Sequence, residues 1–428
     1  MRKQASFIKR GFDKMDVRVS QKKLSGEIAA ISSKSHAHRV LIAAALCREP
    51  VDVALSDTSD DIDATRECLL QLSKSSPVFN CRESGSTLRF LMPLSMALKR
   101  KAIFTGTGGL PNRPLSPLKE QMEEHGCVFS IGEGNICILE GGLTGGKFTF
   151  PGNVSSQFLT GLLFALPLLP ESSEILISSP LQSADYVTMT IHVLELFGVK
   201  IEVHYDESSA GETYSAFRIK GNQRFVSPGS VTIEGDWSNA AFWLAAGAVS
   251  QSSGTLVTCR GLNPFSSQGD RKITAIIKAF GGEISKSNSD VSSSPGSLRG
   301  IEINAGSIPD LIPVIAVIAS VSKGRTQIIN AERLRIKESD RLHALYSCLS
   351  TLGADVAELP DSLIINGKTS LKGGTVSGFN DHRIVMSMAI AALCCEEPVI
   401  IKGAEAINKS YPNFFDDFKK LGGEVTVI

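Results

Sequence analysis

The chain has 428 residues, of which 42% are hydrophobic and 21% are charged. A single hydrophobic core rarely grows past about 250–300 residues, so we expect two domains, and this hydrophobic content argues against a disordered chain. The 44 basic residues balance the 44 acidic ones. A net charge of zero disfavours a binder of nucleic acid or of acidic membranes, so any basic cluster must be formed locally by folding.

The cysteines and the apolar stretches both indicate a cytoplasmic protein. The nine cysteines are scattered, and no pair has C-x-x-C spacing, so a disulfide framework and a zinc ribbon are disfavoured. The charged start of the chain has no apolar run behind it; it predicts a short extension and no secretory signal. The longest apolar stretch, residues 158–169, is shorter than the ~18 residues of a membrane span.

Six stretches share a pattern of a β-rich run, a polar loop and an amphipathic helix, usually followed by a glycine and another apolar run. The marker glycines recur every ~70–80 residues, at Gly126, Gly198, Gly281, Gly353 and Gly422. Such a period predicts repeated supersecondary units. Three units precede Val231 and three follow it, which predicts two similar halves joined near residues 231–236. We expect the segment before Lys34 to add a strand to the second half.

A second pattern, a short polar loop followed by a strongly apolar helix, alternates with the first. We expect these helices within residues 32–47, 83–98, 153–169, 235–249, 307–320 and 380–395. Helices that are apolar nearly all round lie inside a domain, and the Ser, Thr, Asp or Asn at each start is a good N-cap. Capped helix starts without a ligand are one interpretation. Because the polar starts also carry Lys, Arg or Gln, a shared site for polyanions at converging helix N-termini is the other.

Familiar cofactor, metal and hydrolase motifs are missing from the sequence. Residues 141–147 nearly match a P-loop, but Phe148 follows where Ser or Thr would hold Mg²⁺, so we interpret them as a glycine turn. There is no G-x-G-x-x-G, H-E-x-x-H or G-x-S-x-G motif. His36 and His38 have no third ligand nearby, so we expect no metal.

Basic residues at the polar loops form the most informative group. They are Lys34, Arg39, Arg89, Arg113, Lys337, Arg341, Arg383 and Lys409. Singly, each is most often a solvated surface charge. Because they lie in different repeats at loops that folding would bring together, we expect a cluster, and such a cluster needs anions to offset its repulsion. Arg binds phosphate or carboxylate through paired hydrogen bonds, and Lys acts as a point charge.

Two carboxylates, Asp310 and Glu338, lie beside these cations. Asp310 precedes an apolar run and could be a helix cap, and Glu338 could simply pair with a neighbouring cation. A carboxylate retained in a cationic site stays ionised and can act as a general base. On a helix, Lys337 and Arg341 would share one face because they are four residues apart.

Several motifs occur in a specific order along the chain: SKSHAHR, ESGSTLR, NRPLSPL, VSSQFLTGLL, QSADY, EGDWSNAAFWLAA, SSQGD, IPD, RIKESDRL, NDHR and NKSYPNFF. Through this ordered set, the chain from about Lys22 to Ile428 resembles the 5-enolpyruvylshikimate-3-phosphate (EPSP) synthase family. The resemblance implies an α/β fold, a two-domain inside-out α/β barrel in which each domain has three βαβαββ repeats with buried helices. The domains would be residues 33–234 and residues 1–32 plus 235–428, with the active site in the cleft between them.

The reaction implied by this resemblance moves the carboxyvinyl group of phosphoenolpyruvate to the 5-hydroxyl of shikimate 3-phosphate and releases phosphate. It belongs to the shikimate pathway to chorismate and aromatic amino acids. It proceeds through a tetrahedral adduct and needs no metal and no organic cofactor. The family also implies a cytoplasmic monomer whose partners are the two small substrates, with no nucleic acid or membrane partner.

The same resemblance assigns roles to individual residues. Phosphoenolpyruvate would bind to Lys34, Gly85, Arg113, Gln157, Arg341, Arg383 and Lys409. Shikimate 3-phosphate would bind to Ser35, Arg39, Ser155, Ser156, Gln157, Ser183, Asp310 and Lys337. Asp310 resembles the base for the hydroxyl proton. Lys34 and Glu338 are candidates for delivering a proton to the methylene carbon and removing it.

The sequence departs from the family pattern at several of these positions. Ile31-Ser32 replaces a frequent Pro-Gly, which alters the loop before Lys34. Glu83 stands where many members have Asn, and a carboxylate there weakens anion binding unless a cation compensates for it. Arg333 replaces a frequent Asn near the shikimate phosphate. Gly85 leaves room for the inhibitor glyphosate, so we expect sensitivity, although Phe90 replaces a common Pro.

Two alternatives remain open from the sequence. A UDP-N-acetylglucosamine enolpyruvyl transferase has the same fold, but that family uses a loop cysteine near the LPNRPL segment, and none lies between Cys81 and Cys127. A non-catalytic binder of phosphorylated metabolites would not need both Asp310 and Glu338.

Overall fold

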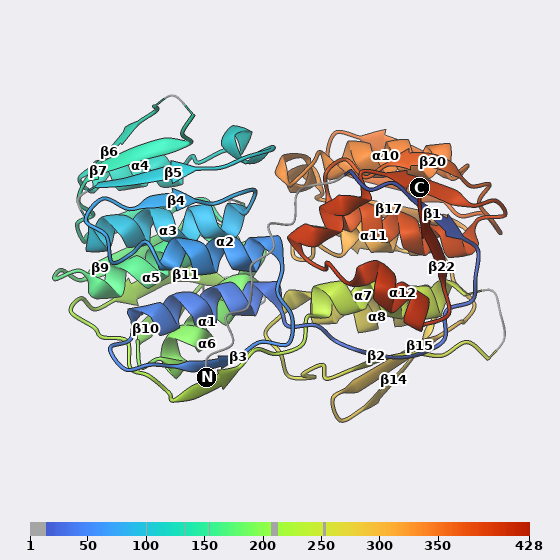
Figure 1. Cartoon of the computed structure of the whole chain (residues 1–428), viewed down its shortest axis with the longest axis horizontal. Helices are drawn as coiled ribbons and strands as arrows, with labels where there is room; N and C mark the ends of the chain where they lie inside the picture. The colour runs from blue at the N-terminus through green and yellow to red at the C-terminus, as the bar shows by residue number, and fades with distance from the viewer. Residues whose placement is uncertain (1–13, 100, 133, 154, 207–212, 251–253) are drawn as a thin grey trace, which may run out of the picture.

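The computed structural model describes residues 14–99, 101–132, 134–153, 155–206, 213–250 and 254–428. Two halves lie side by side along the longest axis of the molecule (Figure 1). The predicted N-terminal extension lies mostly in residues 1–13, outside the described residues.

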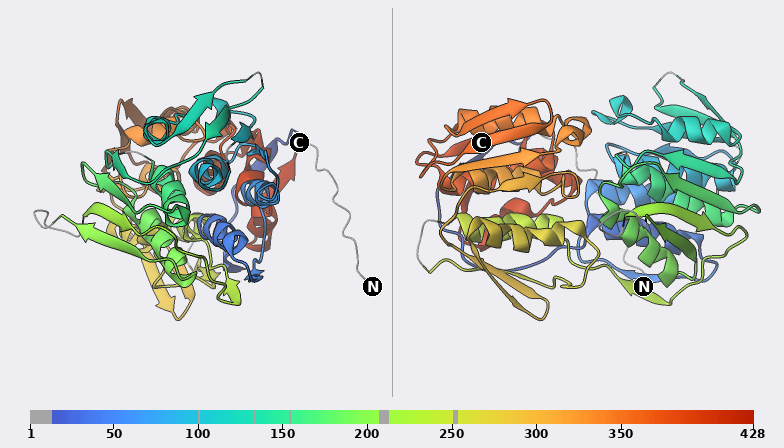
Figure 2. Two further views of the ribbon diagram at one scale, coloured as in Figure 1. Left: turned by 90° about the vertical axis from the view of Figure 1, so that its left-hand side faces the viewer. Right: turned by 180° about the vertical axis from the view of Figure 1, so that it is seen from behind.

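Each half has three apolar helices at its centre, and all six lie within the stretches predicted for them. The helices of the first half are α1 (Lys34–Leu46), α3 (Gly85–Leu98) and α5 (Ser156–Ala165). Those of the second half are α7 (Trp237–Val249), α9 (Ile312–Ser320) and α11 (His382–Ala391). Seen from one end, helices of the first half lie at the centre with strands around them (Figure 2).

Six further helices follow the amphipathic pattern. They are α2 (Asp60–Leu69), α4 (Leu118–Glu124), α6 (Ala184–Leu196), α8 (Ile273–Phe280), α10 (Arg341–Thr351) and α12 (Phe414–Lys420). The marker glycines follow the last five of these with φ between 78° and 100°. Glycine adopts this left-handed conformation without a Cβ penalty, so it ends each helix and turns the chain into the next strand. Short 3₁₀ helices are η1 (Leu110–Asn112), η2 (Leu166–Leu168), η3 (Gly269–Lys272), η4 (Glu332–Ile336), η5 (Ala392–Cys394) and η6 (Ala404–Lys409).

The strands of the first half form two four-stranded sheets and one strand pair. One sheet has the order β4 (Val78–Asn80), β5 (Lys101–Thr105), β7 (Cys137–Gly141), β6 (Cys127–Ser130). The other has the order β8 (Lys147–Phe150), β9 (Ser173–Ile177), β11 (Tyr214–Ile219), β10 (Ile201–Tyr205). The pair is β3 (Asp52–Ala54) with β12 (Ser230–Thr232).

The second half has three four-stranded sheets with the same arrangement, a parallel pair followed by antiparallel neighbours. The first is β2 (Gly26–Ala29), β13 (Val257–Arg260), β15 (Asp290–Ser294), β14 (Glu283–Ser287). The second is β16 (Glu302–Asn304), β17 (Arg325–Ile329), β19 (Ser362–Asn366), β18 (Asp355–Leu359). The third is β20 (Gly374–Ser377), β21 (Val399–Lys402), β1 (Val17–Ser20), β22 (Glu424–Val427).

The N-terminal segment belongs to sheets of the second half, as expected. β1 lies between β21 and β22, where Val17 faces Ile401 on one side and Val427 on the other. β2 runs parallel to β13. The chain therefore crosses between the halves twice, and a bridge between Ser32 and Gly235 joins the two crossings.

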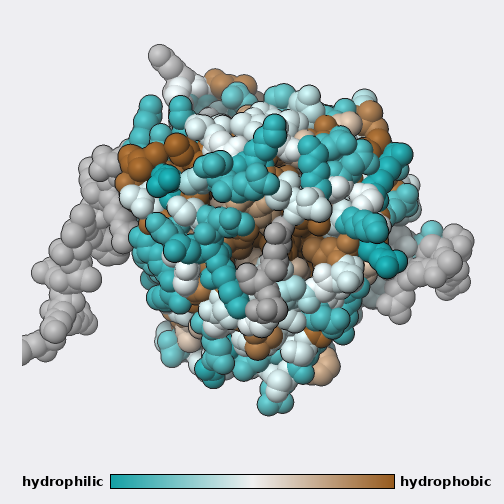
Figure 3. Space-filling model, turned by 90° about the vertical axis from the view of Figure 1, so that its right-hand side faces the viewer, coloured by the Kyte–Doolittle hydropathy of each residue, from teal (hydrophilic) through white to brown (hydrophobic). Residues whose placement is uncertain are grey.

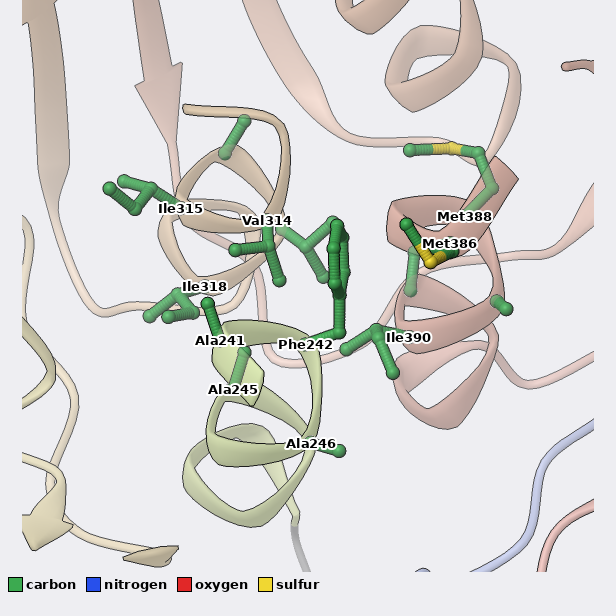
Figure 4. Packing of buried hydrophobic residues seen from close by; sticks show 14 of the residues in the cluster. Ala241, Phe242, Ala245, Ala246, Val314, Ile315, Ile318, Met386, Met388 and Ile390 are labelled. Carbon is green, nitrogen blue, oxygen red and sulfur yellow. The ribbon is translucent and has the colours of Figure 1, made fainter. Parts of the chain in front are cut away.

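Buried hydrophobic residues form two separate clusters. One draws on residues 37–233, and the other on residues 17–31 and 237–425. In the second cluster, side chains of α7, α9 and α11 pack against one another, among them Phe242, Val314 and Met386 (Figure 4). The domain boundaries at residues 33–234 and at 1–32 plus 235–428 stay a prediction, and residues 1–13 lie outside the described part.

On the end face of the second half, hydrophilic residues predominate and apolar ones occur in separate areas (Figure 3). No helix among the described residues combines the length and the apolar character needed to cross a membrane.

Candidate active site

A cavity of about 370 Å³ lies between the two halves. Most of the residues predicted for the site line it. From the first half these are Lys34, Ser35, Arg39, Gly85, Arg113, Ser155, Ser156, Gln157 and Ser183; from the second half they are Asp310, Lys337, Glu338 and Arg383. Folding therefore brings together residues that are up to about 350 positions apart in the sequence.

The starts of the apolar helices deliver many of these residues to the cavity. Lys34, Gly85 and Ser156 are the first residues of α1, α3 and α5. Their N-caps are serines whose hydroxyls accept backbone N–H groups, so each helix N-terminus is fixed where it meets the cavity. Gly85 allows a close approach, because a Cβ there would lie 2.5 Å from Nη1 of Arg113.

The start of α9 differs from this pattern. Its N-cap is Leu311 without a side-chain hydrogen bond, so the expected polar cap is wrong for this helix. Asp310 is left free to interact with cations. Its Oδ1 accepts from Arg341 Nη1 at 2.7 Å and lies 3.5 Å from Lys337 Nζ, and its Oδ2 lies 3.4 Å from Arg383 Nη2.

These cations determine the ionisation of Asp310. Burial alone would raise the pKa of this carboxyl, but Arg383, Lys337 and Arg341 outweigh burial and hold the pKa well below its usual range. Asp310 is therefore a carboxylate at the cavity wall. The prediction that Lys337 and Arg341 share a helix face is wrong, because α10 begins only at Arg341; both nevertheless reach Asp310.

Arg341 does not line the cavity but contacts two carboxylates that do, Asp310 and Glu338. Its side chain is 1% exposed, and it donates to Asp310, to Glu338 Oε2 at 2.6 Å and to Asp381 Oδ2 at 2.8 Å. Burial opposes ionisation of Glu338, but Arg341 and then Arg113 hold its pKa well below its usual range. The buried guanidinium of Arg341 thus contributes to the ionisation of both carboxylates predicted for catalysis.

Cations also gather on the first half. Arg89 donates to Gln157 Oε1 at 2.7 Å and to the carbonyl oxygen of Pro114 at 3.0 Å. Burial, together with the nearby Arg113, lowers the pKa of Arg89 to about 9. Among the described residues, the buried Nε atoms of Arg89 and Arg113 have no hydrogen-bond partner. Buried donors of this kind are costly unless an acceptor reaches them, which favours a bound anion.

Lys34 and Arg39 lie on the first turns of α1. The backbone N–H of Lys34 donates to Asp236 Oδ2 at 3.0 Å, and its Nζ lies 2.7 Å from Asp61 Oδ2. Arg39 donates through Nε to Thr190 and through Nη2 to Thr160, which ties α1 to α5 and α6. Arg39 therefore also holds the helices of the first half together.

Two of the positions that depart from the family pattern, Arg333 and Glu83, make contacts between the halves. Arg333 Nη1 donates to Ser183 Oγ at 3.2 Å and to Gln182 Oε1 at 3.3 Å. Lys409, which does not line the cavity, donates to Glu83 Oε2 at 2.8 Å. The cation needed beside Glu83 is therefore present.

Sequence reasoning missed several residues of the cavity wall, among them three with titratable side chains. The hydroxyl of Tyr186 donates to Asp310 Oδ2 at 3.1 Å, and Asp61 pairs with Lys34. His382 is 1% exposed, and within the described part of the chain neither of its ring nitrogens has a hydrogen-bond partner. Tyr186 and His382 lie within the quoted motifs QSADY and NDHR, which was the available signal, whereas Asp61 resembles any acidic residue in the first turn of a helix.

Among the described residues, no group of three or more His, Cys, Asp or Glu side chains could hold a metal ion. What the cavity offers is a set of fixed cations, helix N-termini and two ionised carboxylates. Such a set binds small molecules that carry phosphate and carboxylate groups.

Fold and cavity together define an enzyme-like α/β protein with an anion-binding cleft between two repeated halves. The model of the EPSP synthase (3-phosphoshikimate 1-carboxyvinyltransferase) family matches residues 19–418. The chain belongs to this family.

Relatives agree with this assignment, and solved structures share the fold. The chain is 43% identical to the 3-phosphoshikimate 1-carboxyvinyltransferase of Clostridium kluyveri, over 96% of this chain and 98% of that protein. The corresponding protein of Clostridium acetobutylicum is also 43% identical, over 94% of this chain and 96% of its own. EPSP synthase from Acinetobacter baumannii superposes with a TM-score of 0.77 at 21% identity, covering 96% of this chain and 100% of that one. The enolpyruvyl transferase NikO from Streptomyces tendae has a TM-score of 0.75 at 17% identity, over 97% of this chain and 99% of its own. The predicted fold class is confirmed.

Proposed function

We propose that this chain transfers the carboxyvinyl group of phosphoenolpyruvate to the 5-hydroxyl of shikimate 3-phosphate, giving 5-enolpyruvylshikimate 3-phosphate and phosphate. The observation that carries the proposal is the cavity between the halves, which cations of both halves line and where the ionised Asp310 contacts Lys337 and Arg383. Its two substrates bring two phosphates and two carboxylates, which match this positive charge. Membership in the EPSP synthase family supports the same reaction.

Phosphoenolpyruvate binds to Lys34, Gly85, Arg113, Gln157, Arg341, Arg383 and Lys409 in this proposal. Shikimate 3-phosphate binds to Ser35, Arg39, Ser155, Ser156, Gln157, Ser183, Asp310 and Lys337. The unpartnered Nε of Arg113 supports the first assignment, and the contact of Arg333 with Ser183 adds a further cation beside the second site.

Asp310 takes the proton of the 5-hydroxyl of shikimate 3-phosphate while the oxygen of that hydroxyl attacks C2 of phosphoenolpyruvate. In the free protein this carboxylate is a weak base, because Arg383, Lys337 and Arg341 lower its pKa. Bound anions offset the charge of these cations, so the pKa of Asp310 rises when both substrates are present. Substrate binding thus makes Asp310 a better base.

Two further groups handle the proton of the methylene carbon. Lys34, which is a cation, delivers a proton to that carbon as the tetrahedral adduct forms. Glu338 is ionised through Arg341 and Arg113, so it accepts a proton from the methyl group as phosphate leaves. Glu338 has the accepting role because it is ionised; its low pKa makes it a weak base in the free protein, as for Asp310.

The enzyme acts as a cytoplasmic monomer on these two small molecules in the shikimate pathway. Phosphate release measured with both substrates tests the function. Release with shikimate 3-phosphate but not with UDP-N-acetylglucosamine supports it, release with the nucleotide sugar identifies the related transferase, and binding without release identifies a non-catalytic binder. Glyphosate should inhibit with an inhibition constant that is not far above the KM for phosphoenolpyruvate.

A further inference from the structure

The carboxylate of Glu83, two residues before Gly85 of the cavity wall, joins the two halves. Its Oε2 accepts hydrogen bonds from Lys409 Nζ at 2.8 Å and from Asn380 Nδ2 at 2.9 Å. Glu83 precedes α3 in the first half, whereas Asn380 precedes α11 and Lys409 ends η6 in the second half. The Glu83 and Lys409 side chains are only 25% and 10% exposed, so solvent screens this pair less than an ordinary surface pair.

The surroundings hold the Glu83 side chain in one place. Gly108, whose φ is +57°, lies directly against it, and a Cβ at Gly108 would overlap the Glu83 carboxylate. The backbone N–H of Thr107 donates to the carbonyl oxygen of Arg82 at 2.7 Å, which fixes the same loop beside Glu83. Two residues after Glu83, Gly85 lines the cavity. The carboxylate is therefore held in the first half, on the loop that leads into the cavity wall at Gly85.

The ammonium group of Lys409 keeps a donor for a ligand. It has three N–H groups, and two are used by Glu83 and by the carbonyl oxygen of Asn380 at 2.6 Å. The hydrogen bonds to Glu83 and to Asn380 hold Nζ in a defined position between the two halves. An anion can take the third N–H without displacing Glu83.

We propose that Glu83 is a positioning residue, which holds Lys409 of the opposite half where it meets the phosphate of phosphoenolpyruvate and thereby sets the affinity for that substrate. This proposal rests on the proposed function. It reverses the simple electrostatic expectation that a carboxylate beside an anion site weakens binding, because Glu83 restrains Lys409 and links it to the first half.

Glu83→Gln tests the proposal, since glutamine has the same size and keeps the packing against Gly108 but lacks the charge. We expect the KM for phosphoenolpyruvate to rise about tenfold, in line with the loss of a charge-assisted hydrogen bond. The KM for shikimate 3-phosphate and kcat should stay within about twofold, because the groups that contact that substrate are untouched.

A double-mutant cycle separates positioning from a merely structural role. In Lys409→Met, the change Glu83→Gln should leave the KM for phosphoenolpyruvate unchanged, because the group that Glu83 positions is gone. The matched control is Lys272→Met. This change breaks another ion pair between the halves, in which Lys272 Nζ lies 2.7 Å from Asp185 Oδ2, and neither residue lines the cavity. This control should not raise the KM for phosphoenolpyruvate selectively.

Several results would overturn the inference. A lower KM for phosphoenolpyruvate in Glu83→Gln would show that Glu83 only repels the anion. An equal rise for both substrates, additive effects with Lys409→Met, or the same rise in Lys272→Met would show that Glu83 only stabilises the contact between the halves. If the unchanged protein releases no phosphate from the two substrates, the proposed function fails, and this outcome is distinct from the others.

Discussion

Lys337 is the site cation whose charge depends most on pH. Burial lowers its pKa to about 8, although Asp310, 3.5 Å away, raises it. The lysine is therefore charged below about pH 8 and loses its proton above it, whereas phosphate esters are fully ionised there. We expect the KM for shikimate 3-phosphate to rise as pH increases from 7 to 9. Steady-state kinetics over this pH range measure the effect.

The control for this prediction is Lys337→Arg, because a guanidinium stays charged throughout the range. Its KM for shikimate 3-phosphate should change little between pH 7 and 9. If the variant shows the same rise as the unchanged protein, Lys337 is not the titrating group.

Asp310 should contribute to the chemical step more than to binding. In Asp310→Ala we expect kcat to fall by ~10²–10⁴, the usual contribution of a general base. Binding of shikimate 3-phosphate, measured by calorimetry, should persist. Without the Asp310 carboxylate, the positive charges of Lys337 and Arg383 are no longer offset and remain available to the anionic ligand. A kcat close to that of the unchanged protein would rule out this role.

Individual residues show how far the sequence could define the site. Lys34, Arg113 and Arg383 could be predicted because each lies in a polar loop within an ordered set of motifs. The buried ion pair between Arg341 and Asp381 could not be predicted, since nothing in the sequence indicates that Asp381 is fully buried against Arg341. Such pairing depends on which helix starts meet in space, and that follows from tertiary packing.

The starts of α10 and α11 are joined by this buried ion pair. Asp381 caps α11 through the N–H of Arg383 and accepts from Nε of Arg341, the first residue of α10. Breaking one partner of a buried pair leaves the other charge uncompensated, so we expect Asp381→Asn to lower the free energy of unfolding by about 3 kcal/mol. Urea denaturation measures this loss.

An ion pair between η4 and β18 provides the comparison. Glu358 pairs with Arg335 at 2.8 Å, but this pair is more exposed to solvent. Glu358→Gln should therefore cost less than about 1 kcal/mol. Equal losses of unfolding free energy in Asp381→Asn and Glu358→Gln would show that burial does not make the Arg341–Asp381 pair more important for stability.

At the scale of elements, the sequence predicted the helices better than the sheets. The apolar and amphipathic helices follow directly from hydrophobic periodicity and from the marker glycines that end them. For β1, the sequence predicted only that the N-terminal segment adds a strand to the second half. It did not predict that this strand lies between β21 and β22. Its register depends on backbone partners about 400 residues away, which local pattern does not encode.

The whole molecule has no net charge, yet the cavity between its halves concentrates cations. Contacts already cross this cleft, among them Lys409 with Glu83, Arg333 with Ser183 and Tyr186 with Asp310. Cations of both halves, such as Lys34 and Arg113 on one side and Lys337 and Arg383 on the other, line the cavity and repel one another. Attraction and repulsion between the halves are therefore opposed when no anion is bound.

Bound substrates should shift this balance toward a closed molecule. Two polyanions neutralise the cations of both halves and bridge them. In the part of the chain that the structure describes, the crossings at residues 30–33 and 233–236 are the covalent links between the halves that must bend. We expect the radius of gyration, measured by small-angle X-ray scattering, to decrease when shikimate 3-phosphate is added together with glyphosate or phosphoenolpyruvate. Phosphate alone at the same ionic strength is the control, because it screens the cations without bridging the halves. An unchanged radius with both ligands at saturating concentrations would show that the cleft is preformed and that closure has no part in assembling the site.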